Sequence, residues 1–484
     1  MFELTIGHIL LIAVATWHYA LWCGFVSDDH AVIAQRKDII PDGEKQDRQE
    51  KFWVKVFNDG PVMYFVNRFM WRFFNKQPFW WHLLSLSMHI FNTYLFYLVA
   101  VSIIGREAAL IAALIWTVNP MHNQIVVWCS GRPYAFAVCL SLICLLFWDN
   151  PLIVIPLYTL ATITSFMTAF LPIIIKLIHP EAWQGNLYLG ILFAMIPIFL
   201  WKFTRRFGRG ALILDRANFQ FRFKRLNNLA RVYMYYILAL IFPVKMGWYH
   251  ESGFRYNDRW DGFNVWAVIG FVAVFYLTQQ AYGVWFLLGM IPQMNLLASN
   301  SYLQDRYLYF GSMGLALLAA PYLIEYPFIL VAFVAICVSK SYTYTRQMTT
   351  DEALYRENWR NHKASDYAIN NLAFFLIQQQ RFEEARIYIK RGLAINRDNK
   401  LLWYNLGITW AAQAHLKSQE GKFRFFRALD CWKMALQLEP RWRKPAEDIE
   451  KLTKYLLEAK VLTTNPADAA AGLPVINMPM QKGK

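Results

Sequence analysis

Long apolar runs are the feature that most constrains this chain, because they recur from residue 4 to residue 343 and then stop. A helix that crosses a lipid bilayer needs about 20 mostly apolar residues in succession. The runs lie at residues 4–26, 79–104, 106–126, 133–148, 151–178, 186–203, 228–250, 263–279, 281–298, 306–323 and 326–343. The sequence therefore predicts an all-α protein whose residues 1–343 form a polytopic membrane helical bundle of about 11 spans.

The run at residues 151–178 is too long for one straight span. Polar residues and a proline indicate a break inside it: Thr162, Thr164, Ser165, Thr168 and Pro172. If two helices form here, the chain gains one span and its C-terminus changes side. The first run lacks a basic residue before it and a small-residue cleavage site after it, so we expect a retained helix rather than a removed signal peptide.

The orientation of the bundle follows from its charges. Residues 202–231 carry many arginines and lysines against the single acid Asp215, and the positive-inside rule places such a loop in the cytoplasm. Without the extra span, the N-terminus is then cytoplasmic, whereas the loop at residues 27–78 and the C-terminal domain are extracytoplasmic. The formal net charge of +16 is concentrated in the basic loop. We therefore expect contact with membrane lipids and no nucleic-acid partner.

Two features of the 27–78 loop are informative. The adjacent acids Asp28 and Asp29 follow the first run directly, and two carboxylates at the mouth of a span indicate chemistry; the alternative is a pair of helix-capping or solvated acids. Apolar residues at 62, 65, 66, 69, 70 and 73 repeat at intervals of three and four. This spacing predicts an amphipathic helix on the membrane surface, which either frames an entrance for a lipid or acts as a simple anchor.

The polar C-terminal region, residues 344–460, is predicted to be a helical domain. Residues 365–440 fit two helical hairpins of tetratricopeptide-repeat type, with extra residues between the halves of the second, and an amphipathic helix at 445–460 is expected to cap them. Such a domain is expected to bind a protein or peptide partner. Residues 461–484 are rich in Ala, Pro and Gly, which predicts a disordered tail. Six cysteines show no CxxC spacing, so neither a disulfide framework nor a zinc site is expected.

Several short motifs occur in a fixed order along the chain. After the acid pair come a Pro-Phe-Trp-Trp-His-Leu stretch with a later His at residues 78–89, an Asn-Pro-Met-His stretch ending in Gly-Arg at 119–132, and Gln-Asp-Arg-Tyr-Leu-Tyr at 304–309. With the repeats that follow, this order resembles the transmembrane-and-tetratricopeptide-repeat mannosyltransferases, within the GT-C class of polyprenyl-phosphate-sugar glycosyltransferases. The resemblance covers nearly the whole chain.

The resemblance implies an inverting transfer of a sugar from a polyprenyl-phosphate donor to a protein acceptor on the extracytoplasmic side, in a bacterial inner membrane or an endoplasmic reticulum. Asp28 or Asp29 would act as general base or hold a divalent cation, Mg²⁺ or Mn²⁺. Arg306 and Arg132 would bind the donor phosphate. Three further residues are expected to contact acceptor or donor: His122, His89 and Tyr307.

Each of these assignments has a structural alternative. Asp305-Arg306 fits an interfacial ion pair, Arg132 fits a snorkelling arginine, and a histidine inside a bilayer must find a hydrogen-bond partner whatever its function. The chain also departs from the family, with Ser165-Phe166-Met167 in place of Ser-Lys-Glu. The competing hypothesis is a catalytically degenerate GT-C scaffold whose repeat domain recruits partners in a membrane complex. A transporter is disfavoured because no inverted repeat is detectable.

Overall fold

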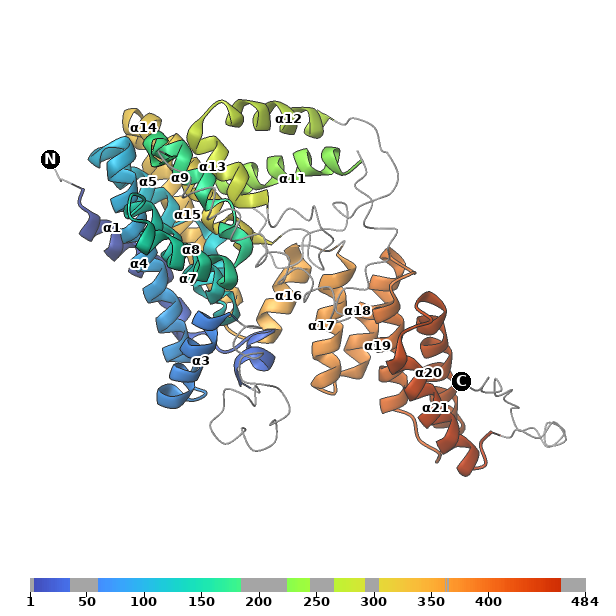
Figure 1. Cartoon of the computed structure of the whole chain (residues 1–484). Coiled ribbons are helices and arrows are strands. Elements are labelled where there is room, and N and C mark those ends of the chain that lie inside the picture. Colours follow the sequence, from blue (N-terminus) through green and yellow to red (C-terminus); the bar gives the residue numbers. More distant parts are fainter. Residues whose placement is uncertain are drawn as a thin grey trace. The chain divides into compact units, whose positions relative to one another are not determined.

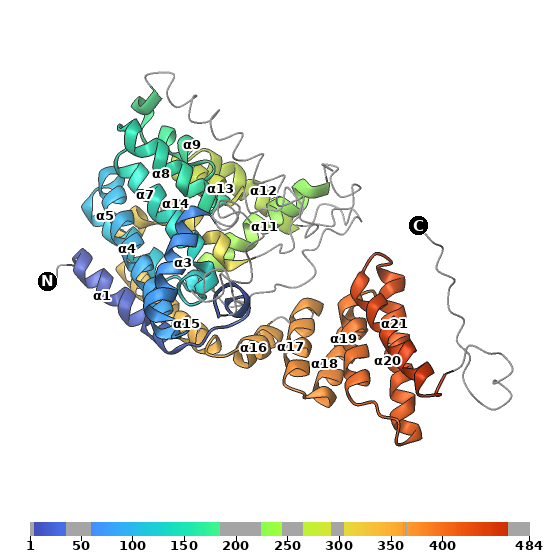
Figure 2. The same ribbon diagram turned by 60° about the horizontal axis from the view of Figure 1, so that its bottom comes forward.

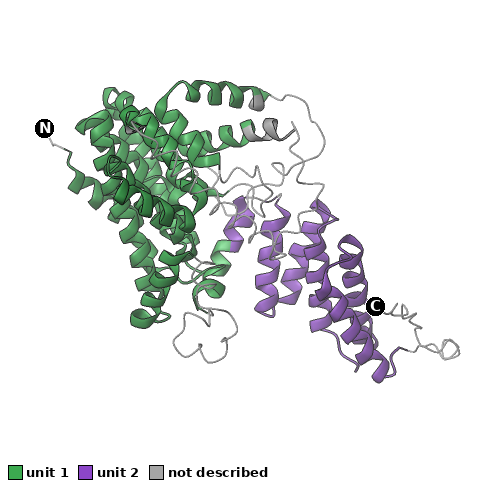
Figure 3. Cartoon of the chain, in the orientation of Figure 1, with its two compact units in different colours: residues 1–354 green, residues 355–484 purple. Residues whose placement is uncertain are grey.

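A computed structural model describes residues 4–34, 60–183, 224–243, 265–291, 304–361, 363 and 365–462. Every regular element in these ranges is a helix (Figure 1), so the all-α prediction is confirmed for this part of the chain. The chain divides into two compact units, residues 1–354 and 355–484 (Figure 3). The predicted domain limit at residue 343 falls inside the helix α15 (Pro327–Gln347), which continues beyond the apolar run.

Most helices of unit 1 lie on the apolar runs; α3, in the 27–78 loop, does not. The helices are α1 (Ile6–Trp17), α3 (Pro61–Phe74), α4 (Pro78–Ile104), α5 (Arg106–Thr117), α6 (Asn123–Val126), α7 (Arg132–Leu146), α8 (Pro151–Thr164), α9 (Leu171–Ile178), α11 (Lys224–Ile241), α12 (Val265–Thr278), α13 (Ala281–Met290), α14 (Leu308–Glu325) and α15. Its core is formed by buried faces of helices that include α4, α5, α7, α13 and α14, with Trp116, Trp285 and Tyr309 among the largest buried side chains.

Four helical segments in the described ranges are long and apolar enough to cross a membrane: Pro78–Ile104, Cys129–Leu146, Asp305–Glu325 and Pro327–Gln347. They identify a membrane protein, in agreement with the sequence. The full number of spans and their orientation stay predictions. The expected span at 186–203 and most of the basic loop lie outside the described residues.

The run at residues 106–126 is not one helix, which corrects the predicted span. Helix α5 ends at Thr117, and a 3-10 turn follows at Pro120–His122 before the short helix α6. Asn119 precedes a proline, a position that disfavours helical backbone. Its side chain accepts a hydrogen bond from Met121 N–H (3.1 Å) and donates one to Leu240 O (3.1 Å). The chain therefore turns inside the unit, and a connection at 118–131 joins α5 to α7.

The predicted break in the run at 151–178 is confirmed. Helix α8 ends at Thr164, a 3-10 turn at Phe166–Thr168 follows, and α9 starts at Leu171. At about 1.5 Å per residue, neither piece reaches the thickness of about 30 Å that a hydrocarbon core has. Neither α8 nor α9 therefore spans a bilayer by itself.

Helix α16 (Asp351–Asn361) leads into unit 2, which Figure 2 shows from a second side. Unit 2 contains the hairpin α17 (Asp366–Gln378) and α18 (Phe382–Ile395), the hairpin α19 (Lys400–Ala412) and α20 (Gln419–Leu438), and the helix α21 (Arg443–Glu458). The small and large packing positions expected of the first repeat are all buried: Ile369, Leu372, Ala373, Leu376, Ala385, Ile389 and Gly392. In the second hairpin, a Cβ on Gly407 would lie 2.3 Å from Trp432 Nε1, so only glycine fits there.

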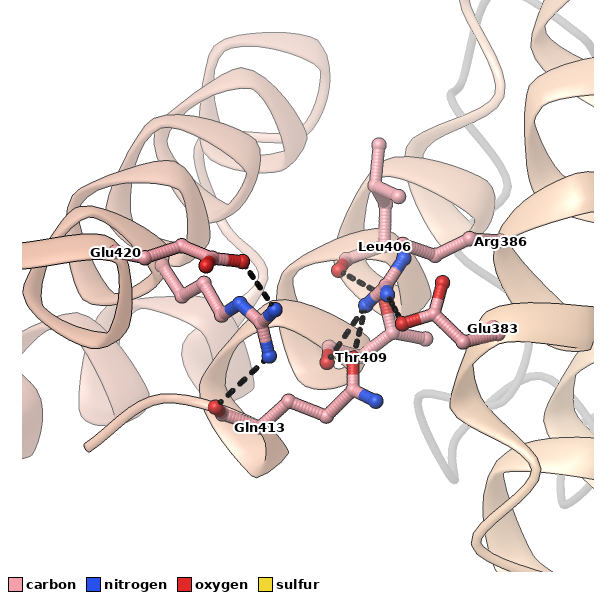
Figure 4. A network of polar contacts seen from close by, with 7 residues as sticks. Glu383, Arg386, Leu406, Thr409, Gln413 and Glu420 are labelled. Carbon is pink, nitrogen blue, oxygen red and sulfur yellow. Dashed lines mark hydrogen bonds and ion pairs between the residues drawn. The ribbon is translucent and has the colours of Figure 1, made fainter. Parts of the chain in front are cut away.

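A buried arginine joins the two hairpins (Figure 4). Arg386 on α18 is 6% exposed and donates to Glu383, to the Thr409 carbonyl (3.4 Å) and to Gln413. Its guanidinium also lies 4.3 Å from the ring centroid of Trp410. At the other end of the domain, Val461 and Leu462 are buried against α20 and α21, although they begin the segment predicted to be a tail; residues 463–484 lie outside the described residues.

Candidate functional site

The acid pair lies on a tight turn that follows the first helix. Asp29 N–H donates to Val26 O (3.1 Å) and Val32 N–H donates to Asp28 O (2.8 Å). Asp28 is exposed on this turn, whereas Asp29 has an exposed fraction of 0%. The sequence assigns the same possible roles to both carboxylates, but the structure places one in solvent and buries the other.

Asp29 is the anchor of this turn. Its Oδ1 accepts hydrogen bonds from Ser130 N–H (2.7 Å) and Ser130 Oγ–H (2.6 Å), and its Oδ2 accepts a longer one from Val26 N–H (3.4 Å). Burial raises the pKa of Asp29 to about 6, although the Ser130 hydrogen bonds and the positive charge of Arg132 act in the opposite direction. The Ser130 contacts tie the acid-pair turn to the 118–131 connection.

Arg132 begins α7 beside this anchor and is 1% exposed. Its Nε donates to Cys129 O (2.8 Å), its Nη2 donates to Asn67 Oδ1 (3.2 Å) on α3, and its guanidinium lies 4.6 Å from the Trp81 ring centroid. Its Nη1 is buried and has no hydrogen-bond partner within the described part of the chain. A buried donor left unpaired is costly, so this N–H group is suited to an anionic ligand.

Arg306 also contacts the connection at 118–131. Its backbone N–H (3.4 Å) and its Nη1 (3.3 Å) donate to Gln124 Oε1, and its guanidinium lies 5.0 Å from the Trp128 ring centroid. Further hydrogen bonds go to Gln304 Oε1 (3.0 Å) and Tyr134 Oη (3.4 Å). The structure thus places both predicted phosphate-binding arginines against residues 124–129. Tyr307 is 4% exposed and packs in a hydrophobic cluster beside Arg306.

A glycine permits the tight path of this connection. A Cβ on Gly131 would lie 2.1 Å from the carbonyl oxygen of Gln124. Any side chain at this position would push residues 124 and 131 apart. Since Gln124 binds Arg306 and Ser130 binds Asp29, the close approach at Gly131 links the two halves of the candidate site.

The two predicted histidines lie in a buried polar cluster. His89 Nδ1 is 2.9 Å from Tyr309 Oη, and its Nε2 is 3.0 Å from Thr117 O. His122 Nε2 is 3.1 Å from Ser312 Oγ, and both rings have an exposed fraction of 0%. For His89, this geometry agrees with the alternative interpretation, in which a histidine satisfies its hydrogen bonds inside the bundle. His122 Nδ1, in contrast, is buried and has no hydrogen-bond partner among the described residues. Contact of either residue with acceptor or donor stays a prediction.

A divalent cation has few protein ligands available at this turn. The described residues contain no group of three or more His, Cys, Asp and Glu side chains that could hold a metal ion. Asp28 is the exposed carboxylate of the pair, whereas Oδ2 of the buried Asp29 accepts one long hydrogen bond, from Val26 N–H. This set does not suit zinc, which takes three or four protein ligands. An exposed carboxylate such as Asp28 is the type of ligand that Mg²⁺ takes, because this ion often binds one or two carboxylates and completes its shell with water and substrate phosphates. Binding of a cation here stays a prediction.

Sequence reasoning missed four side chains that shape the site: Asn67, Trp81, Gln124 and Ser130. Ser130 and Gln124 stand in the motif that ends in Gly131-Arg132, so the motif contained the signal, but spacing alone does not show that Ser130 binds Asp29. The departure at Ser165-Phe166-Met167 falls on the turn between α8 and α9. Met167 on this turn is fully buried in the main hydrophobic core of unit 1.

Comparison with known proteins gives a partial match. The chain is similar to protein O-mannosyl-transferase TMTC3 of Mus musculus, with 27% identity over 132 residues, which are 26% of this chain and 14% of the relative. The human protein of the same name is 28% identical over 133 residues, 25% of this chain and 14% of the relative. The match thus spans a small part of the length of these relatives. No protein-family model and no solved structure matches the chain.

Proposed function

We propose that this chain is an integral-membrane inverting glycosyltransferase that moves a sugar from a polyprenyl-phosphate donor to a hydroxyl group of a protein on the extracytoplasmic side. The observation that carries the proposal is the acid-pair turn. On this turn the carboxylate of Asp28 is exposed, and the carboxylate of Asp29 binds Ser130 in the connection at 118–131. The same connection contacts both arginines. The names of the relatives, which state protein O-mannosyl transfer, support a hydroxyl acceptor and mannose as the sugar.

In the proposed reaction, the acceptor hydroxyl oxygen forms a bond to C1 of the sugar while the bond from C1 to the phosphate oxygen breaks. The incoming oxygen approaches opposite to the phosphate, so the configuration at C1 inverts. Asp28 takes the hydroxyl proton, because an exposed carboxylate is within reach of an acceptor. The phosphate leaves with the bonding electron pair. Asp29 acts as a positioning residue through its hydrogen bonds to Ser130.

The two arginines would stabilise the leaving phosphate. Arg132 offers its unpaired Nη1–H, and Arg306 offers a half-buried guanidinium that also donates to Gln124 and Gln304 and lies over the Trp128 ring. Hydrogen bonds from a guanidinium to an oxyanion are stronger than bonds between neutral groups. In the alternative role of the acid pair, Asp28 and Asp29 would hold Mg²⁺ or Mn²⁺, which would neutralise part of the phosphate charge. Transfer that persists in excess chelator would remove the cation from the proposal.

The repeat domain has a separate proposed role. Its two hairpins and the following helix would hold the protein acceptor, as the stacked hairpins of repeat domains commonly offer an extended binding surface. The extracytoplasmic location of this domain and of the acid pair rests on the charge distribution of the sequence.

The test is the intact mass of extracytoplasmic proteins from cells that carry the wild-type chain or its Asp28→Asn variant. We expect proteins from the variant to lack hexose-sized mass increments that the wild type adds. Asp149→Asn is the matched control, because it removes an exposed carboxylate from the turn between α7 and α8. Full glycosylation in both variants would refute Asp28 as the base.

A second candidate function is a catalytically degenerate scaffold that recruits partners through unit 2. The observation that favours it is the turn at Ser165-Phe166-Met167, where the resemblance leads one to expect a lysine and a glutamate. Identical masses from wild type and Asp28→Asn, together with a protein that co-purifies with the full chain and is lost when unit 2 is disrupted, would favour the scaffold.

A further inference from the structure

We propose that Asp351 is a positioning residue for the acid pair and fixes the turn that presents Asp28. This inference rests on the proposed function, because it assigns a role in the same site. Asp351 is the first residue of α16, and all of the apolar runs after the first lie between it and the turn in the sequence. Nothing in its local sequence sets it apart from other acids at helix N-termini.

Asp351 contacts the residues on both sides of the acid pair. Its Oδ1 accepts a hydrogen bond from Ser27 N–H at 2.7 Å, and its Oδ2 lies 2.8 Å from His30 Nε2. Ser27 directly precedes Asp28, and His30 directly follows Asp29. One carboxylate therefore holds both ends of a four-residue segment with the acid pair between them.

The backbone of the turn needs such a restraint. Ser27 has a φ of +53°, in the left-handed region that residues other than glycine rarely adopt. A residue persists in this conformation only where surrounding contacts hold it. The hydrogen bond from Ser27 N–H to Asp351 is one such contact, and it acts on the strained residue itself. Loss of the Asp351 carboxylate would let Ser27 relax, and a change of φ there would redirect Asp28.

The surrounding chain supports the same contact. Gly24 N–H donates to Thr349 O (3.0 Å), and Cys23 Sγ is 3.7 Å from Thr345 O. The end of α15 and the start of α16 thus lie along residues 23–30. Asp29 holds the turn to Ser130 from another direction. The acid pair is therefore fixed by two independent anchors, and Asp351 supplies the one that acts on Ser27.

The direct test uses a spin label and does not depend on catalysis. All six native cysteines are buried, so a nitroxide reagent should react selectively with an Asp28→Cys variant at the exposed position 28. We expect the label spectrum to show greater mobility when Asp351→Ala is added. Glu357→Ala, which removes a carboxylate from the same helix α16, is the matched control and should leave the spectrum unchanged. An unchanged spectrum with Asp351→Ala would overturn the proposal.

The kinetic test uses the full chain with Asp28 intact and polyprenyl-phosphate mannose as donor. We expect Asp351→Ala to lower kcat by about 100-fold, as misplacement of a catalytic group by about 1 Å does, with little change in KM for the donor. Asp351→Asn keeps an acceptor for Ser27 N–H and should restore most of kcat. Wild-type kcat in Asp351→Ala would refute the role of Asp351. If the wild type transfers no sugar, the proposed function fails, and the spectra alone decide whether Asp351 holds the turn.

Discussion

Replacement of Ser130 by alanine would separate the role of Asp29 from that of Asp28. Ser130 Oγ–H donates to Asp29 Oδ1 at 2.6 Å, a bond that favours the ionised carboxylate. Hydrogen bonds to charged groups contribute about 1.5–3 kcal/mol, and one pKa unit corresponds to about 1.4 kcal/mol. Ser130→Ala should therefore raise the pKa of Asp29 from its value of about 6 by about one to two units.

Activity should report this change as a shift of its acid limb. Protonation of Asp29 weakens its hold on Ser130, so wild-type transfer should fall as pH drops through about 6. In Ser130→Ala, the fall should begin at a higher pH and should already reduce the rate at pH 7. The assay is the pH dependence of kcat/KM between pH 5 and 8.5. Ser141→Ala, which removes another buried hydroxyl, is the control. Identical acid limbs in wild type and Ser130→Ala would refute the reasoning.

Stability should depend on pH with a defined sign. Burial raises the pKa of Asp29 from 3.8 to about 6, so the folded protein binds this proton more tightly than the unfolded chain does. The corresponding stabilisation is complete below about pH 3.8 and is lost as pH rises through about 6. It amounts to roughly 3 kcal/mol. Asp29→Asn, which stays neutral, should show a smaller decrease of Tm between pH 4.5 and 7.5 than the wild type; an equal decrease would contradict this assignment.

Three further predictions follow from single contacts. Gly131→Ala should lower Tm and abolish activity, because the new Cβ would lie 2.1 Å from Gln124 O. The control is Gly7→Ala, whose Cβ would have its nearest contact at 3.6 Å and which should leave Tm nearly unchanged. Arg132→Gln should raise KM for the donor at least about 10-fold through loss of a charged hydrogen bond to phosphate, and unchanged KM would exclude Arg132 from the donor site. Arg386→Met should destabilise unit 2 by about 2 kcal/mol in denaturant unfolding, while Lys454→Met, on an exposed side chain, should not.

Much of the fold could be predicted from the sequence because its signals are local. A long apolar run favours a helix wherever it stands, and α4, α7, α14 and α15 lie on the runs that predicted them. The three-and-four spacing in the 27–78 loop became α3, whose Phe65, Phe69 and Phe73 are exposed along one face. The break in the run at 151–178 was also visible, because its polar residues are neighbours in sequence. The predicted helix at 106–126 was wrong beyond Thr117, because Asn119 before a proline ends the helix and bonds to α11.

In the candidate site, too, some features could be predicted from the sequence and others depend on the tertiary structure. The sequence by itself determined that two carboxylates stand together after the first helix and that Arg132 and Arg306 are the arginines of two of the recognised motifs. Only the tertiary structure decided that Asp29 is buried and Asp28 is exposed. The reason is that Asp29 binds Ser130, which lies 101 residues further along the chain. Asp351, which holds Ser27, is 324 residues away. Local patterns set helices and turns, but the environment of a side chain depends on contacts between distant segments, and those exist only once the chain has packed.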